Sequence, residues 1–117
     1  MVQPVINATS AVELRGLIDG VRVAPEVREY IAAITRATRE ESTISLGASP
    51  RASVALMRAA RAAAVLEGRA FATPDDVKDR VPSALRHRVT LSPELEVEGR
   101  SVDEVLAAIL LRIEAPK

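Results

Sequence analysis

The sequence predicts an all-α fold, a small bundle of four or five helices with room for one very short strand pair. Alanine recurs throughout the chain, whereas aromatic residues make up only 2% of it. This composition favours helices packed closely through small side chains over a β-sandwich. Several apolar stripes also repeat at helical spacing behind a capping residue or a proline. At 117 residues the chain has the size of one domain.

A first, short helix is predicted near the N-terminus. Ser10 and Glu13 form a capping-box pattern ahead of an apolar stripe that ends near Gly20. Residues 1–9 are therefore expected to be a linker or docking arm, and residues 10–117 the helical domain.

The second and third helices have clearer signals. Pro25 suits the first turn of a helix, and residues 40–48 then lose the helical period and are expected to form a loop. Ser49 and Pro50 start a third helix that ends before Gly68. The inner stripe predicted for the second helix is Val27, Tyr30, Ile31, Ile34 and Thr38. That of the third is Ala52, Leu56, Ala59, Ala63 and Leu66.

The last third of the chain alternates short elements. Residues 68–73, "GRAFAT", are expected to be extended or turn-like. Thr73 starts a further helix, which Pro82 should split into two pieces because proline removes a backbone donor. Residues 89–99 look irregular, with room for a brief strand. Ser101 begins a second capping-box pattern before a final amphipathic helix.

Composition argues against several classes of function. Basic and acidic residues balance at 16 each, which disfavours a general polyanion binder, including a helix-turn-helix nucleic-acid protein. The chain has no cysteine and a single histidine, His87, so no metal site is expected. No apolar run approaches the length that spans a bilayer, and the N-terminus lacks a leader pattern. We therefore expect a cytoplasmic protein.

No complete catalytic motif is present. The phosphate-binding spacing G-x-x-x-x-G-K-[ST] is absent, and the only lysines are Lys78 and Lys117. Neither H-E-x-x-H nor G-x-S-x-G occurs. The adjacent carboxylates Asp75 and Asp76 lie in the first turn of a predicted helix, whose positive end explains them. The isolated chain is therefore not expected to be an enzyme.

The segment "GASPRA", residues 47–52, places Arg51 in the first turn of the third helix. A cation there opposes the helix dipole, at a cost of about 0.3–1 kcal/mol unless an anion relieves the conflict. A phosphate group would meet the free backbone donors and the planar guanidinium together. A solvated first-turn arginine is the simpler alternative.

Three segments carry a resemblance to a known family: "YIAAITRATRE", "LGASPRASVALMRAARAAAVLEGRAFATPDDV" and "SALRHRVTL". In this order they resemble the C-terminal lid of MoxR-type AAA+ ATPases, over about residues 21–116. The resemblance implies a small helical lid that follows an α/β nucleotide-binding core. It also implies that Arg51 is the sensor-2 arginine, which contacts the γ-phosphate of ATP held with Mg²⁺ mainly by the core. Ser49 and Pro50 would place this residue and start its helix.

The same resemblance implies partners, namely the core domain of the same polypeptide, neighbouring subunits of a hexameric ring, and von Willebrand factor A-type proteins. The family's phosphate-binding loop, magnesium-binding strand, sensor 1 and arginine finger are missing from this chain, so it should not hold nucleotide strongly by itself. The alternative is a stand-alone helical interaction module or adaptor that presents an alanine-lined groove. Whether Arg39, Arg58 or His87 contacts nucleotide or the core stays open.

Overall fold

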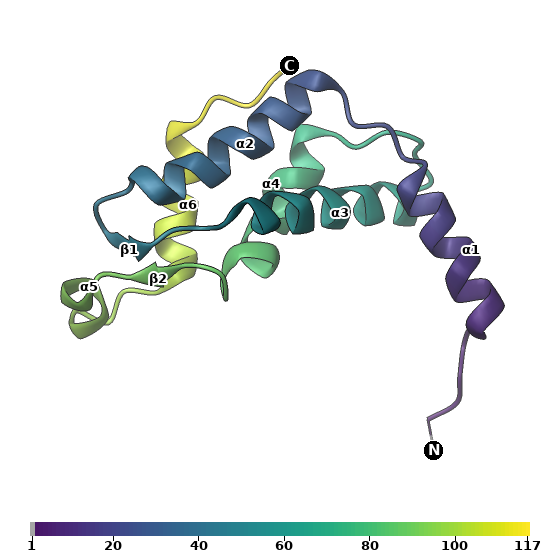
Figure 1. The fold of residues 1–117 in the computed structure, drawn as a ribbon, viewed down its shortest axis with the longest axis horizontal. Helices are drawn as coiled ribbons and strands as arrows, with labels where there is room; N and C mark the ends of the chain where they lie inside the picture. The colour runs from purple at the N-terminus through teal and green to yellow at the C-terminus, as the bar shows by residue number, and fades with distance from the viewer. Residues whose placement is uncertain (1) are drawn as a thin grey trace.

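The computed structural model describes residues 2–117, which form six helices and one two-stranded sheet (Figure 1). The helices are α1 (Ala8–Asp19), α2 (Pro25–Glu40), α3 (Pro50–Leu66), α4 (Pro74–Leu85), α5 (Pro93–Val97) and α6 (Val102–Arg112). The strands β1 (Ile44–Leu46) and β2 (Thr90–Leu91) pair antiparallel. The predicted helical fold with a very short strand pair is confirmed. No helix within the described range is long and apolar enough to cross a membrane.

One hydrophobic core joins α2, α3, α4 and α6. Figure 1 shows α2 and α3 next to each other, with α6 crossing behind α2 and α1 leading away toward the N-terminus. The largest fully buried apolar side chains are Ile34, Leu56, Leu85, Leu106 and Ile109. Small residues on α3 let its neighbours approach closely, as the alanine content predicts.

The inner face of α3 differs from the predicted stripe in its second half. Ala52 and Leu56 are fully buried as expected, but Ala60 and Ala64 continue the row, in place of Ala59 and Ala63. Leu66, predicted to close the stripe, is 88% exposed. The prediction was wrong here because alanine occupies both sets of positions, so only packing against the neighbouring helices selects the face.

The first helix begins earlier than the Ser10 pattern predicts. The side chain of Asn7 caps α1 by accepting a 2.8 Å hydrogen bond from the backbone N–H of Ser10. Ala8 and Thr9 therefore belong to the helix, and the capping box with Glu13 does not form. No residue of α1 is buried, so this helix stands at the edge of the core.

Helix α4 is continuous, and the predicted split at Pro82 is wrong. Thr73 and Asp76 form a complete capping box at its start, as the start signal indicated. Val81 and Leu85, on either side of the proline, are fully buried. Their burial in the core holds the helix together across the one backbone donor that the proline lacks.

The predicted loop 40–48 contains β1, which the sequence did not indicate. Ile44 pairs with Leu91 and Leu46 with Thr90, so Ser45 forms a bulge between them. The Ser45 hydroxyl donates to the carbonyl oxygens of Thr90 and Leu91 at 3.2 and 3.1 Å. Because its partner strand lies about 45 residues away along the chain, local pattern could not reveal this strand.

The region after α4 is more regular than expected. The brief strand anticipated within residues 89–99 is β2, but the segment also contains the short helix α5, which begins at Pro93. The Ser101 side chain caps α6 by accepting from the Glu104 backbone N–H at 3.2 Å. The Glu104 carboxylate pairs with Arg100 instead of closing the capping box.

Candidate functional site

Arg51 lies in the first turn of α3, and its side chain is exposed. It takes part in none of the ion pairs formed within residues 2–117. Ser49 is the N-cap but its side chain makes no capping hydrogen bond, and Pro50 occupies the first turn, which contains no acidic residue. The guanidinium is therefore unpaired. At the helix start Pro50 has no N–H and the Ala52 N–H donates to the Ser49 carbonyl oxygen at 2.9 Å, so an anion there would meet the Arg51 side chain and its backbone N–H.

Two threonines on the buried face of α2 hold this end of α3. The Thr38 hydroxyl donates to the Thr35 carbonyl oxygen at 2.6 Å and accepts from the backbone N–H of Ala48 at 2.9 Å. The Thr35 hydroxyl accepts from the Ser53 hydroxyl at 2.8 Å. Both threonines are fully buried. These hydroxyls join α2 to the chain on both sides of Arg51.

A close backbone approach tightens the same junction. A Cβ atom added to Gly47 would lie 2.7 Å from the Cα of Arg39 and 2.8 Å from its backbone nitrogen. No side chain fits in this space, so the strand-to-helix turn packs directly on the last turn of α2. This role of Gly47 could not be predicted from sequence, because the distance depends on how α2 and the turn pack.

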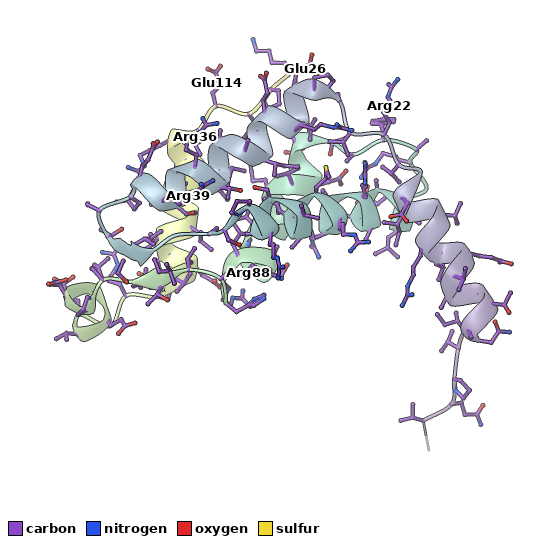
Figure 2. All side chains as sticks on the ribbon, viewed as in Figure 1. Arg22, Glu26, Arg36, Arg39, Arg88 and Glu114 are labelled. Atoms are coloured by element: carbon purple, nitrogen blue, oxygen red, sulfur yellow. The ribbon has the colours of Figure 1, made fainter. Side chains whose placement is uncertain are left out.

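The other arginines and the histidine left open by sequence lie around the molecule. Arg39 is exposed in the last turn of α2 (Figure 2), on the helix end that Gly47 contacts. Arg58 is seven residues beyond Arg51, about 10 Å along the helix, and lines a hollow with Arg15, Ile18 and Asp19 of α1. His87 is exposed in the turn after α4. The structure thus brings Arg39 near the start of α3 and directs Arg58 toward α1.

A second charged cluster, missed by sequence reasoning, lies beyond the opposite end of α3. Arg69 donates two hydrogen bonds of 2.7 Å to the carboxylate of Asp76, which also accepts from the Thr73 backbone N–H at 2.8 Å. The Arg69 guanidinium, and then the Thr73 donors, hold the pKa of Asp76 below its usual value. Asp76 therefore has a structural role, joining the "GRAFAT" segment to α4, in addition to its favourable place at a helix start.

No group of three or more metal-ligating side chains occurs in the part of the chain that the structure describes. Glu41 and Arg112 form an ion pair between the end of α2 and the last turn of α6, and this pair holds the pKa of the Glu41 carboxyl below its usual value. These charges are paired within the fold. Arg51 forms no ion pair in the described residues, a property that it shares with Arg39 and Arg58, and it differs from them by lying in the first turn of a helix.

Comparison with known proteins bears on the domain as a whole. Residues 36–109 match the family model described as the AAA lid domain. The chain is 36% identical over 114 residues to the protein YeaC of Bacillus subtilis, covering 97% of this chain and 36% of YeaC. It is 32% identical over 98 residues to the chaperone MoxR1 of Mycobacterium tuberculosis, covering 76% of this chain and 26% of that protein.

A solved structure gives the same result. The crystal structure of a protein from Cytophaga hutchinsonii, provisionally described as an ATPase, superposes with a TM-score of 0.90 and 31% identity over 98% of this chain. The matched region covers 38% of the Cytophaga protein. This chain therefore spans between about a quarter and two fifths of the length of these three relatives. The likeness therefore concerns one domain of a longer protein. This chain belongs to the AAA lid domain family, as the lid of a MoxR-type AAA+ ATPase.

Proposed function

We propose that this lid closes over ATP and Mg²⁺ bound by a nucleotide-binding core in the same polypeptide, with Arg51 as the sensor-2 arginine on the γ-phosphate. The observation that carries the proposal is the exposed guanidinium of Arg51 on a helix start that has no acidic side chain. The Arg51 backbone N–H and its planar cation suit phosphate oxygens. Ser49 and Pro50 start the helix and set the direction of Arg51 without needing to touch nucleotide.

The chemistry supplied by Arg51 is electrostatic. The guanidinium is worth most when negative charge is redistributed on the transferred phosphoryl group, because it is already oriented by a rigid helix. Loss of the γ-phosphate after hydrolysis removes its counterpart and weakens lid closure. The lid thereby converts the state of the nucleotide into a change of domain position.

The rest of the machinery lies outside this chain in the proposal. The core domain would supply the phosphate-binding loop and the magnesium ligands, and neighbouring subunits of a hexameric ring would receive the movement of the lid. The same proposal includes partner proteins with a von Willebrand factor A-type domain. It also places this protein in the cytoplasm. The lid alone would neither hydrolyse ATP nor hold it strongly.

An adaptor that presents an alanine-lined groove has less support. Ala52, Ala60 and Ala64, the inner alanines of α3, are fully buried in the core. They are covered by the protein's own helices and offer no groove to a partner helix. Three other alanines of α3, Ala59, Ala62 and Ala63, do line a surface hollow beside Arg80 and Ser83 of α4, but the match to the AAA lid family favours the lid.

The decisive experiment uses the polypeptide that carries this lid together with its core. Arg51→Ala should lower ATP turnover at saturating ATP by roughly 10-fold or more, while the Kd for ATP changes less. Arg58→Ala, an exposed arginine on the same helix, is the matched control and should turn over at the parental rate. Arg51→Lys keeps the charge but loses the planar fork, so it should restore turnover only in part. Parental turnover in Arg51→Ala would refute the assignment.

A further inference from the structure

We propose that Thr38 is a positioning residue for Arg51, acting through its hydroxyl bond to the backbone just before α3. The proposal rests on the function proposed above, because it concerns how the arginine is aimed at the γ-phosphate. It adds a residue on another helix, with no contact to nucleotide, on which turnover should depend. The residues involved are Thr38 and Thr35 on α2, and Ala48 and Ser53 on either side of Arg51.

The Thr38 hydroxyl is committed at both its donor and its acceptor side. It donates to the Thr35 carbonyl oxygen at 2.6 Å, which fixes its rotamer, and accepts from the Ala48 N–H at 2.9 Å. Thr38 and Ala48 are both fully buried, so water cannot replace this bond. The backbone three residues before Arg51 is thus fixed to the last turns of α2.

A second hydroxyl pair acts on the other side of the arginine. The Thr35 hydroxyl donates to the Ile31 carbonyl oxygen at 3.0 Å and accepts from the Ser53 hydroxyl at 2.8 Å. Thr35 is also fully buried. Ser53 lies two residues after Arg51, so the two contacts bracket the turn that carries the guanidinium.

Local capping does not replace these contacts. The Ser49 side chain makes no capping bond, and its contact with the first turn is the backbone bond from the Ala52 N–H to the Ser49 carbonyl oxygen at 2.9 Å. Gly47 packs on the backbone of Arg39, which leaves the preceding turn little room to move once Thr38 holds Ala48. The direction of the first turn of α3 is consequently set by α2, and a small tilt there is enlarged along the arginine side chain.

Catalytic electrostatics depend steeply on position, since misplacement by about 1 Å can cost about 100-fold in rate. Thr38→Val removes the hydroxyl and keeps the shape of the side chain. In the polypeptide with its core, we expect Thr38→Val to lower kcat for ATP about 5- to 20-fold, with KM for ATP within about twofold. Thr38→Ser, which restores the hydroxyl, should recover most of the turnover.

The test is a double-mutant cycle with Arg51→Ala. If Thr38 acts through Arg51, Thr38→Val causes no further loss of kcat in the Arg51→Ala background. An equal loss in both backgrounds, or parental kcat in Thr38→Val, would overturn the positioning role while Arg51→Ala alone still lowers turnover. Parental turnover in Arg51→Ala would overturn both proposals, and so the two failures are distinguishable.

Two further variants separate positioning from stability. Val81→Ala changes a fully buried residue of α4 and should lower the urea midpoint without lowering kcat. Ser53→Ala removes the second hydroxyl contact from a half-buried helical site, where alanine is well tolerated, and should lower kcat by a smaller factor that also vanishes without Arg51. Loss of kcat in Val81→Ala equal to that in Thr38→Val would show that general destabilisation is the cause and refute the positioning role.

Discussion

The ion pair between Arg69 and Asp76 offers a sharp test of what stabilises the lid. The Asp76 side chain is only 7% exposed and accepts three hydrogen bonds, two from Arg69 at 2.7 Å and one from the Thr73 backbone at 2.8 Å. Asp76→Asn keeps the size of the side chain and one acceptor oxygen but removes the charge. The variant therefore removes the charge and also replaces one accepting oxygen by an amide group that faces an N–H donor, so at least one of the hydrogen bonds is lost.

The expected loss in the free energy of unfolding follows from the hydrogen bonds between Asp76 and Arg69 that the substitution weakens or removes. A hydrogen bond to a charged group contributes about 1 kcal/mol more than a neutral one, and two such bonds join Asp76 to Arg69. The bond that stays loses about 1 kcal/mol and the bond that is broken loses about 1.5–3 kcal/mol, and discounting the sum for the exposed part of the Arg69 side chain leaves about 2–3 kcal/mol. We expect the free energy of unfolding to fall by this amount at pH 7.

The loss should depend on pH in a defined direction. The pKa of Asp76 is lowered in the folded protein by Arg69 and by the Thr73 donors, against about 3.9 in the unfolded chain. The carboxylate therefore contributes its full stability above about pH 5 and loses it as pH falls through the lowered folded pKa. Because Asn does not titrate, the difference between parent and variant should shrink at pH 3.

Urea unfolding of parent and variant at pH 7 and pH 3, followed by circular dichroism, measures both effects. Asp103→Asn is the matched control, since Asp103 also makes a two-bond contact with an arginine, Arg86, but both side chains are about half exposed. It should cost clearly less than Asp76→Asn. Equal losses in the two variants, or a loss for Asp76→Asn that is the same at pH 3 and pH 7, would refute the reasoning.

Two other substitutions test the packing of the helices. Leu56→Ala removes a fully buried side chain from α3 and should lower the free energy of unfolding by about 2–5 kcal/mol, measured by urea denaturation; a loss below about 1 kcal/mol would contradict the core described here. Pro82→Ala supplies the backbone donor missing from the continuous helix α4, so it should raise the thermal midpoint, whereas an unchanged or lower midpoint would show that the proline is accommodated without cost.

The sequence predicted the local backbone structure around the candidate site correctly, while the role of Arg51 stays a prediction. Ser49, Pro50 and Arg51 start α3 as expected, because a helix start depends on residues within one turn of each other. The partners that hold this start, Thr38 and Gly47, were not recognised as such. Thr38 was predicted only as part of an inward stripe, since its hydroxyl bond to Ala48 spans ten residues and requires the docking of α2 on α3.

The sequence alone determined where most helices begin. Pro25, Pro50, Thr73 and Ser101 act within a few residues of themselves, and each lies at or just before a helix start in the structure. Three features were set only by tertiary packing: the buried face of α3, the pairing of β1 with β2, and the continuity of α4. The physical reason is the distance along the chain over which each interaction acts. Caps and prolines act through bonds inside one turn, whereas burial and strand pairing depend on residues that meet only when the chain has folded.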